Sequence, residues 1–280
     1  MAWRDFQALQ RVTTLGDRFV SYVDQGSGDP VVLLHGIPTW GYLWHHQLDE
    51  LSASSRLLIP DLLGYGFSDR SDRFDRSIAQ QAAMVDAWMQ VIGVEQATIV
   101  GHDVGGGVAL RLATHFPRRV ARLCVMNSVC YDAWPTESMW RRGLPHAARD
   151  MSRRDKMTAM VRGLRDGAFA SAPDDDLLES LLAPYATAAG MHSLERDAES
   201  LDVNQTMEIV PLLSRITAPT LVLWGEDDAF LPVDYAERLA WDIPDAELIR
   251  IKGARHFVML DQPDVVRGAL TQLLGVAVPV

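Results

Sequence analysis

An aspartate stands at the centre of the segment with the clearest chemical meaning in this sequence. Gly101 and Gly105 flank Asp103, an apolar strand-like run precedes it, and a helical pattern follows it. Small residues at these positions let the chain turn sharply and hold one side chain out at the end of a strand, as in a nucleophile elbow. Because the strand and the helix lie where the motif requires them, we predict that Asp103 is a nucleophile in place of the usual serine.

Two other interpretations of this segment are weaker. The glycines at 105–107 open a helix and could cradle a pyrophosphate, but the spacing is not G-x-G-x-x-G and the carboxylate of Asp103 would repel phosphate. Asp103 could also be only a helix cap, since aspartate is favoured there. The rest of the chain argues against that, because it supplies the partners that a catalytic aspartate needs.

Two later segments supply an acid and a base. The apolar run 221–225 ends in the acidic loop 226–228, and the run 247–251 is followed by a loop that carries His256. Open α/β sheets place their sites at the carboxyl ends of their strands, so these side chains are expected near Asp103. The chain order of nucleophile, acid and histidine is a known order for a catalytic triad.

The elements that must position these residues form an α/β pattern. Short apolar runs alternate with helical patterns long enough to cross between parallel strands, which predicts a mostly parallel eight-stranded sheet with helices on both faces. The strands are expected at 11–15, 18–24, 31–35, 57–60, 98–101, 122–127, 221–225 and 247–251. The main helices are expected at 77–92, 104–115, 233–241 and 263–274.

The strand pattern is interrupted in the second half of the chain. Residues 131–213 are helical in character, which predicts a cap inserted into a core made of residues 1–130 and 214–280. Three aspartates at 174–176 precede a helical pattern at 177–182, where carboxylates suit the positive end of the helix dipole. We interpret them as a helix cap and not as a metal site.

The composition limits the class of protein. The chain has 280 residues, 48% hydrophobic and 22% charged, which is typical of a globular protein with a large core. Its net charge of −11 disfavours nucleic acid as a partner. Cys124 and Cys130 lack the spacing of a metal site, and no leader or membrane span is evident. We expect a cytoplasmic monomer or homodimer with a small-molecule substrate, no membrane contact and no metal or other cofactor.

Several segments together resemble a known family. The sequence is similar to the α/β-hydrolase superfamily, in particular its aspartate-nucleophile branch of haloalkane dehalogenases and epoxide hydrolases. The resemblance covers most of the chain outside the insertion. The segments that carry it are 35–44 (HGIPTWGYLW), 60–69 (PDLLGYGFSD), 101–106 (GHDVGG), 224–228 (WGEDD) and His256.

The resemblance implies a role for each matched residue. It gives Asp103 as the nucleophile, Asp228 as the charge-relay acid and His256 as the base. The acid stands three residues after the strand-end glycine in this family, which selects Asp228 over its neighbour. Some relatives place the acid after the preceding strand, which leaves Asp132 as the alternative.

A carboxylate at the elbow suits attack on saturated carbon. Attack on a carbonyl would give an anhydride, whereas displacement of halide or opening of an epoxide by Asp103 gives an alkyl ester. The backbone N–H groups of Ile37 and Val104 would form the oxyanion hole while His256 activates water. The alternatives are a receptor-like member of the superfamily that binds without turnover, and an acyl hydrolase or lyase with Asp103 as base.

The leaving group is where this sequence departs from its relatives. Dehalogenases hold halide with a tryptophan after the nucleophile and an asparagine after the His-Gly pair, and this chain has Val104 and Ile37 there. Other tryptophans could replace those donors: Trp40, Trp134 and Trp140. Epoxide hydrolases protonate the opening ring with two cap tyrosines, for which this chain offers Tyr131 and Tyr185. The sequence leaves haloalkane and epoxide open as substrates.

Overall fold

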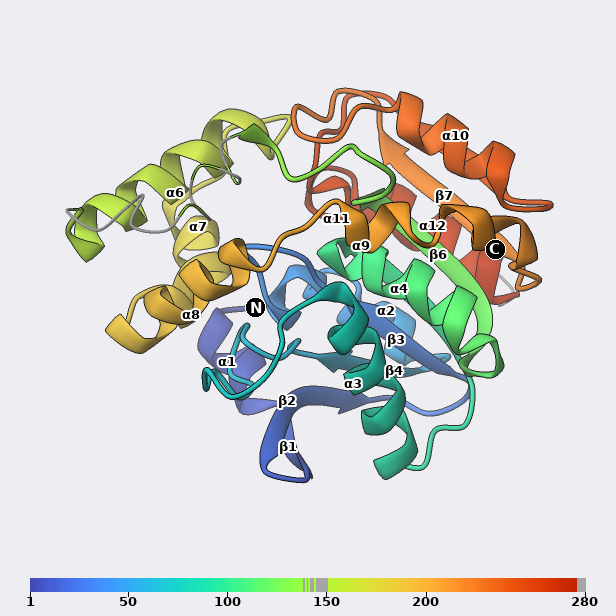
Figure 1. Ribbon diagram of the computed structural model, residues 1–280, viewed down its shortest axis with the longest axis horizontal. Coiled ribbons are helices and arrows are strands. Elements are labelled where there is room, and N and C mark those ends of the chain that lie inside the picture. The colour runs from blue at the N-terminus through green and yellow to red at the C-terminus, as the bar shows by residue number, and fades with distance from the viewer. Residues whose placement is uncertain (138, 140, 142–143, 145–150, 276–280) are drawn as a thin grey trace.

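All eight predicted strands are present and pair into one sheet (Figure 1). The computed structural model describes residues 1–137, 139, 141, 144 and 151–275. The strands are β1 (Gln10–Leu15), β2 (Arg18–Gln25), β3 (Pro30–Leu34), β4 (Arg56–Pro60), β5 (Ala97–Asp103), β6 (Val120–Ser128), β7 (Thr220–Gly225) and β8 (Glu247–Ile251). Each lies within two residues of its predicted bounds, because a buried apolar run is a strong signal for a strand in this class of fold.

The order of the strands confirms the predicted α/β fold. The sheet runs β1-β2-β4-β3-β5-β6-β7-β8. The pairs β1–β2 and β2–β4 are antiparallel, and the pairs from β4 to β8 are parallel. All seven residues of the central strand β5 are buried, as expected for a parallel strand covered on both faces.

Helices of the core connect these strands. Those at the predicted positions are α3 (Ile78–Val91), α4 (Val104–His115), α10 (Asp234–Asp242) and α12 (Pro263–Leu274). Shorter ones are α1 (Trp3–Ala8), η1 (Gly41–Trp44), α2 (Leu48–Ser52), η2 (Pro117–Arg119) and α11 (Val258–Asp261). In Figure 1, α3 and α4 lie in front of the sheet, and α4 packs on β5 and β6.

The chain between β6 and β7 is helical where the structure describes it. Its elements are α6 (Arg153–Gly167), α7 (Asp175–Leu182), η3 (Ala183–Tyr185), α8 (Ala188–Glu199), α9 (Asn204–Met207) and η4 (Val210–Arg215). Asp174 accepts a hydrogen bond of 2.7 Å from the N–H of Leu177, which confirms its predicted role as a helix cap. Figure 1 shows α6, α7 and α8 together at one side of the molecule. The division into a core and a cap at 131 and 213 remains a prediction.

No helix among the described residues is both long enough and apolar enough to cross a bilayer.

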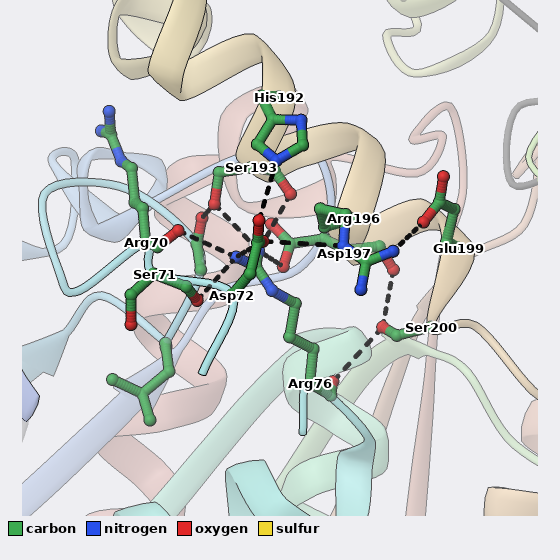
Figure 2. A network of polar contacts seen from close by, with 12 residues as sticks. Arg70, Ser71, Asp72, Arg76, His192, Ser193, Arg196, Asp197, Glu199 and Ser200 are labelled. Atoms are coloured by element: carbon green, nitrogen blue, oxygen red, sulfur yellow. Dashed lines mark hydrogen bonds and ion pairs between the residues drawn. The ribbon is translucent and has the colours of Figure 1, made fainter. Parts of the chain in front are cut away.

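A buried polar network joins α8 to the chain before α3 (Figure 2). The guanidinium of Arg76, two residues before α3, donates to the carboxylate of Asp197 on α8 at 2.6 Å and to the hydroxyl of Ser193 at 2.8 Å. It also donates to the carbonyl oxygens of Arg70 and Ser71. The side chains of Arg76 and Asp197 are 4% and 0% exposed, so each charge depends on the other for compensation.

Removal of Arg76 is therefore expected to be costly. Arg76→Ala leaves the carboxylate of Asp197 buried without its cation, and it should lower the free energy of unfolding by about 3–5 kcal/mol in urea titrations. The matched control is Arg196→Ala on α8, the helix that carries Asp197. Arg196 is 46% exposed and pairs with Glu199 at the surface. That control should cost less than about 1 kcal/mol. Equal losses in the two variants would contradict the importance of the buried pair.

Candidate active site

Asp103 lies at the apex of a sharp turn between β5 and α4. Its φ of 53° is in the region that side chains other than glycine rarely adopt. A Cβ atom at Gly101 would lie 2.2 Å from the carbonyl oxygen of Gly105, and one at Gly105 would lie 2.4 Å from the carbonyl oxygen of His35. The two glycines therefore make the turn possible, and the structure has the geometry of the predicted elbow.

Backbone donors surround the carboxylate of Asp103. The N–H of Ile37 donates to Oδ1 at 2.8 Å, and the N–H of Val104 also hydrogen-bonds this carboxylate. Burial raises the pKa of Asp103, while His256 and the two N–H groups act in the opposite direction. The structure thus places both predicted oxyanion-hole donors against the predicted nucleophile.

His256 lies between two carboxylates. Its Nδ1 donates to Oδ2 of Asp228 at 2.9 Å, and its Nε2 is 3.8 Å from Oδ2 of Asp103. Burial alone would lower the pKa of His256, but attraction and the hydrogen bond to Asp228, with attraction to Asp103, leave it raised. Burial would raise the pKa of Asp228, but His256 and its other donors leave it lowered. The arrangement favours an ionised acid that holds the imidazole in one tautomer.

Each carboxylate oxygen of Asp228 accepts two hydrogen bonds. Besides His256, its Oδ2 accepts from Nδ2 of Asn127 at 2.6 Å, and its Oδ1 accepts from the N–H groups of Phe230 and Leu231 at 2.8 and 3.1 Å. The alternative acid, Asp132, is exposed and accepts from the hydroxyl of Tyr235 at 3.2 Å. The geometry therefore pairs the histidine with Asp228.

Two residues that sequence reasoning missed hold the site in place. Asn127, at the end of β6, is buried at a φ of 38° and also accepts from the N–H of Gly225. His102 donates from Nε2 to the carbonyl oxygen of His256 at 2.9 Å, and burial keeps its pKa well below the ordinary value. A polar residue at the carboxyl end of β6 was a signal for the first, whereas nothing in the sequence points from position 102 to the backbone of His256.

A cavity of about 360 Å³ opens onto Asp103 and His256. Core residues at its inner end include Ile37, Val104, Phe230 and Phe257, and the insertion contributes apolar side chains from α6 and α8. The charged pair Lys156–Glu195 bridges α6 and α8 in the lining. Within the described part of the chain, no cluster of His, Cys, Asp and Glu could hold a metal ion. The cavity suits a small, mainly apolar molecule.

The predicted substrate-contacting tryptophans are only partly in this cavity. Trp134 lines it, but the indole N–H donates to the hydroxyl of Thr206 at 2.6 Å. Trp40 is fully buried outside the lining and donates to the carbonyl oxygen of Ser180, which corrects the prediction that it contacts the substrate. Trp140 lies outside the described residues.

The two predicted tyrosines also lie outside the cavity lining, which is a second correction. The hydroxyl of Tyr131 donates to Asp242 at 2.7 Å, and that of Tyr185 donates to the carbonyl oxygen of Thr39 at 2.8 Å. Both rings are almost completely buried. The physical reason is packing. Both tyrosine side chains lie between the segment that joins β6 to β7 and the rest of the protein, so they do not face the cavity.

Comparison with known proteins agrees with this fold. A family model for the alpha/beta hydrolase fold matches residues 29–263. Haloalkane dehalogenase 2 of Mycobacterium tuberculosis is 27% identical over 91% of this chain and 91% of its own length. Epoxide hydrolase 4 of Mus musculus is 29% identical over 94% of this chain and 78% of its own. A solved alpha/beta hydrolase fold protein from Burkholderia ambifaria superposes with a TM-score of 0.89 at 25% identity, covering 94% and 97% of the two chains.

The pairing of His256 with Asp228 can be tested by titration. Asp228→Asn removes the charge that raises the pKa of His256, so the imidazole should titrate at a clearly lower pH in NMR spectra. Asp132→Asn is the matched control and should leave that titration unchanged. The His256 signal is identified by its loss in His256→Phe. If the titration midpoint of His256 falls in Asp132→Asn and stays unchanged in Asp228→Asn, the assignment of the acid is reversed.

Proposed function

Because the chain belongs to the alpha/beta hydrolase fold family and is a hydrolase of this fold, we propose that it attacks a saturated carbon atom and forms an alkyl ester on Asp103. The observation that carries this proposal is the carboxylate at the elbow, with Oδ1 held by the N–H of Ile37 and Oδ2 turned toward His256. The substrate is a small, mainly apolar molecule that carries its own leaving group. Relatives named as haloalkane dehalogenase and epoxide hydrolase support this class.

The first step is a displacement at carbon. Oδ2 of Asp103 forms a bond to the substrate carbon, the bond from that carbon to the leaving group breaks, and the leaving group departs with the electron pair. Oδ1 stays on its backbone donor and becomes the carbonyl oxygen of the ester. An ionised carboxylate is already a nucleophile, so this step does not need His256 to remove a proton from Asp103.

The second step is hydrolysis of the ester. Nε2 of His256 takes a proton from water, and the water oxygen attacks the Cγ carbon of Asp103. Negative charge develops on Oδ1, where the N–H groups of Ile37 and Val104 stabilise it. The intermediate collapses, the former Oδ2 leaves as the oxygen of an alcohol that takes the proton from Nε2, and the second proton of the water passes from the new carboxyl group to solvent, so that Asp103 is again a carboxylate. Asp228 stabilises the imidazolium that forms between these events.

Formation of the ester lowers the pKa of His256. In the free protein the negative charge of Asp103 contributes to the raised pKa of His256. Alkylation removes that charge, so the pKa of His256 falls when the ester forms. A larger fraction of the imidazole is then neutral and able to accept a proton from water.

The lack of a tyrosine proton donor among the described lining residues supports halide over epoxide oxygen as the leaving group, although the indole N–H groups of Trp40 and Trp134 are also engaged elsewhere. Opening of an epoxide requires a proton for the ring oxygen, whereas halide departs without one. Tyr131 and Tyr185, the predicted proton donors, are buried away from the cavity, and its lining includes no tyrosine among the described residues. We therefore place haloalkanes first and epoxides second as substrates.

Trapping of the ester tests the covalent scheme. His256→Phe keeps the nucleophile and removes the base, so incubation with a substrate should add one alkyl group to each protein chain. Intact-mass measurement detects the adduct, and peptide mapping places it on Asp103. The control variant carries Asp103→Asn in addition and should gain no mass. If the wild-type protein turns over a substrate that never adds mass to His256→Phe, the covalent scheme is wrong.

A single turnover in heavy-oxygen water separates the alternatives. In the covalent scheme the label enters the carboxylate of Asp103, and the alcohol keeps the unlabelled oxygen. An acyl hydrolase or lyase with Asp103 as base leaves the label out of the protein. Binding without product indicates the receptor-like alternative.

A substrate panel tests the choice of leaving group. Bromoalkanes, chloroalkanes and terminal epoxides are offered to the wild-type protein, and release of halide or diol is measured. We expect bromide to be released faster than chloride, because it is the better leaving group, and epoxides to react more slowly than bromides. Asp103→Asn should abolish all release. Faster diol formation than bromide release would reverse the order of the two substrate classes.

A further inference from the structure

Helix α6 supplies one wall of the cavity. Five of its residues line the cavity and recur along one face of the helix. They are Lys156, Ala159, Met160, Gly163 and Leu164. Met160 and Leu164 are buried, whereas Gly163 is exposed, which places Gly163 in the outer part of the cavity wall.

The two glycines of α6 have different explanations. A Cβ atom at Gly167 would lie 2.5 Å from Cζ of Phe230, so close packing of that ring requires a glycine. Apart from the adjoining turns of its own helix, a Cβ atom at Gly163 would meet no atom of the described residues within 4 Å. The backbone at Gly163 is helical and any residue adopts it. Neither packing nor backbone conformation in the described structure requires a glycine there.

Glycine is nevertheless an unfavourable residue inside a helix, worse than any other except proline. Among the described residues, nothing fills the place of a side chain at Gly163 in the cavity wall. We propose that Gly163 is a specificity-determining residue, which leaves room for an extended apolar chain on the substrate. This inference rests on the proposed function and names the part of the substrate that the outer cavity accepts.

The position of Gly163 along α6 supports an extended substrate. At the inner end of this helix, Gly167 packs on Phe230, whose ring lies edge-on to the His256 ring at 5.2 Å between centroids. Gly163 is four residues away, which is about 6 Å along the helix axis. The ion pair of Lys156 with Glu195 lies about 10 Å further along the same helix. A chain that reaches from Asp103 past Leu164 enters the space beside Gly163, and a short substrate does not.

The experiment adds a side chain at this position and at a matched one. Gly163→Leu is compared with Gly268→Leu, because Gly268 lies inside α12 and is exposed. Apart from the adjoining turns of α12, no atom of the described residues lies within 4 Å of its Cβ position. Gly268 does not line the cavity. Both substitutions should raise the melting temperature, since leucine is the better helix former. That shared gain shows that the fold is retained.

The readout is kcat/KM across a series from bromoethane to 1-bromooctane. Gly163→Leu should lower kcat/KM for 1-bromooctane by about tenfold or more, the scale of steric discrimination in an apolar pocket, and leave that for bromoethane unchanged. Gly268→Leu should leave both unchanged. An equal effect of Gly163→Leu on short and long bromides, or no effect on either, would overturn the inference.

A binding measurement separates this inference from the proposed function. Unreactive alcohols, 1-butanol and 1-octanol, are titrated calorimetrically into the wild-type protein and both variants. Weaker binding of 1-octanol by Gly163→Leu alone supports the inference even if no bromide is released by any form of the protein, in which case the proposed function fails. Equal binding of 1-octanol by all three proteins overturns the role of Gly163 whatever the outcome with bromides.

Discussion

The site depends on keeping one carboxylate charged inside the protein. Asp103 is buried, and burial opposes its ionisation. The N–H groups of Ile37 and Val104 and the nearby imidazole of His256 act against that penalty. These same partners are what the proposed reaction uses, because the donors that hold the charged oxygen later stabilise the oxyanion and the imidazole activates water. The turn that positions the carboxylate therefore also brings it to the groups that stabilise its charge.

The strands and the positions of the three triad residues were predictable because they follow from local sequence. Buried parallel strands read as apolar runs, and the end of β5 and the loops after β7 and β8 carry Asp103, Asp228 and His256 in a fixed chain order. Since the carboxyl ends of parallel strands meet at one edge of the sheet, the three side chains had to lie near one another. The N-terminal cap of α7 at Asp174 was predictable for the same local reason.

The parts that escaped prediction depend on tertiary packing. Trp40, Tyr131 and Tyr185 are aromatic residues near the site in sequence terms, but whether a ring faces a cavity or the core depends on the insertion packed against it. Each of the three has its polar atom satisfied within the protein. The pairing of Arg76 with Asp197 joins residues far apart in the chain, and no spacing rule connects them.

The triad and the cavity wall draw on different parts of the fold. The described hydrogen-bonding partners of the side chains of Asp103, Asp228 and His256 all belong to the core elements and the loops between them. The wall that faces them includes residues of α6 and α8. Substitutions in these two helices can therefore reshape the cavity without removing a hydrogen bond of the triad, which makes the helices the natural place for variation between relatives.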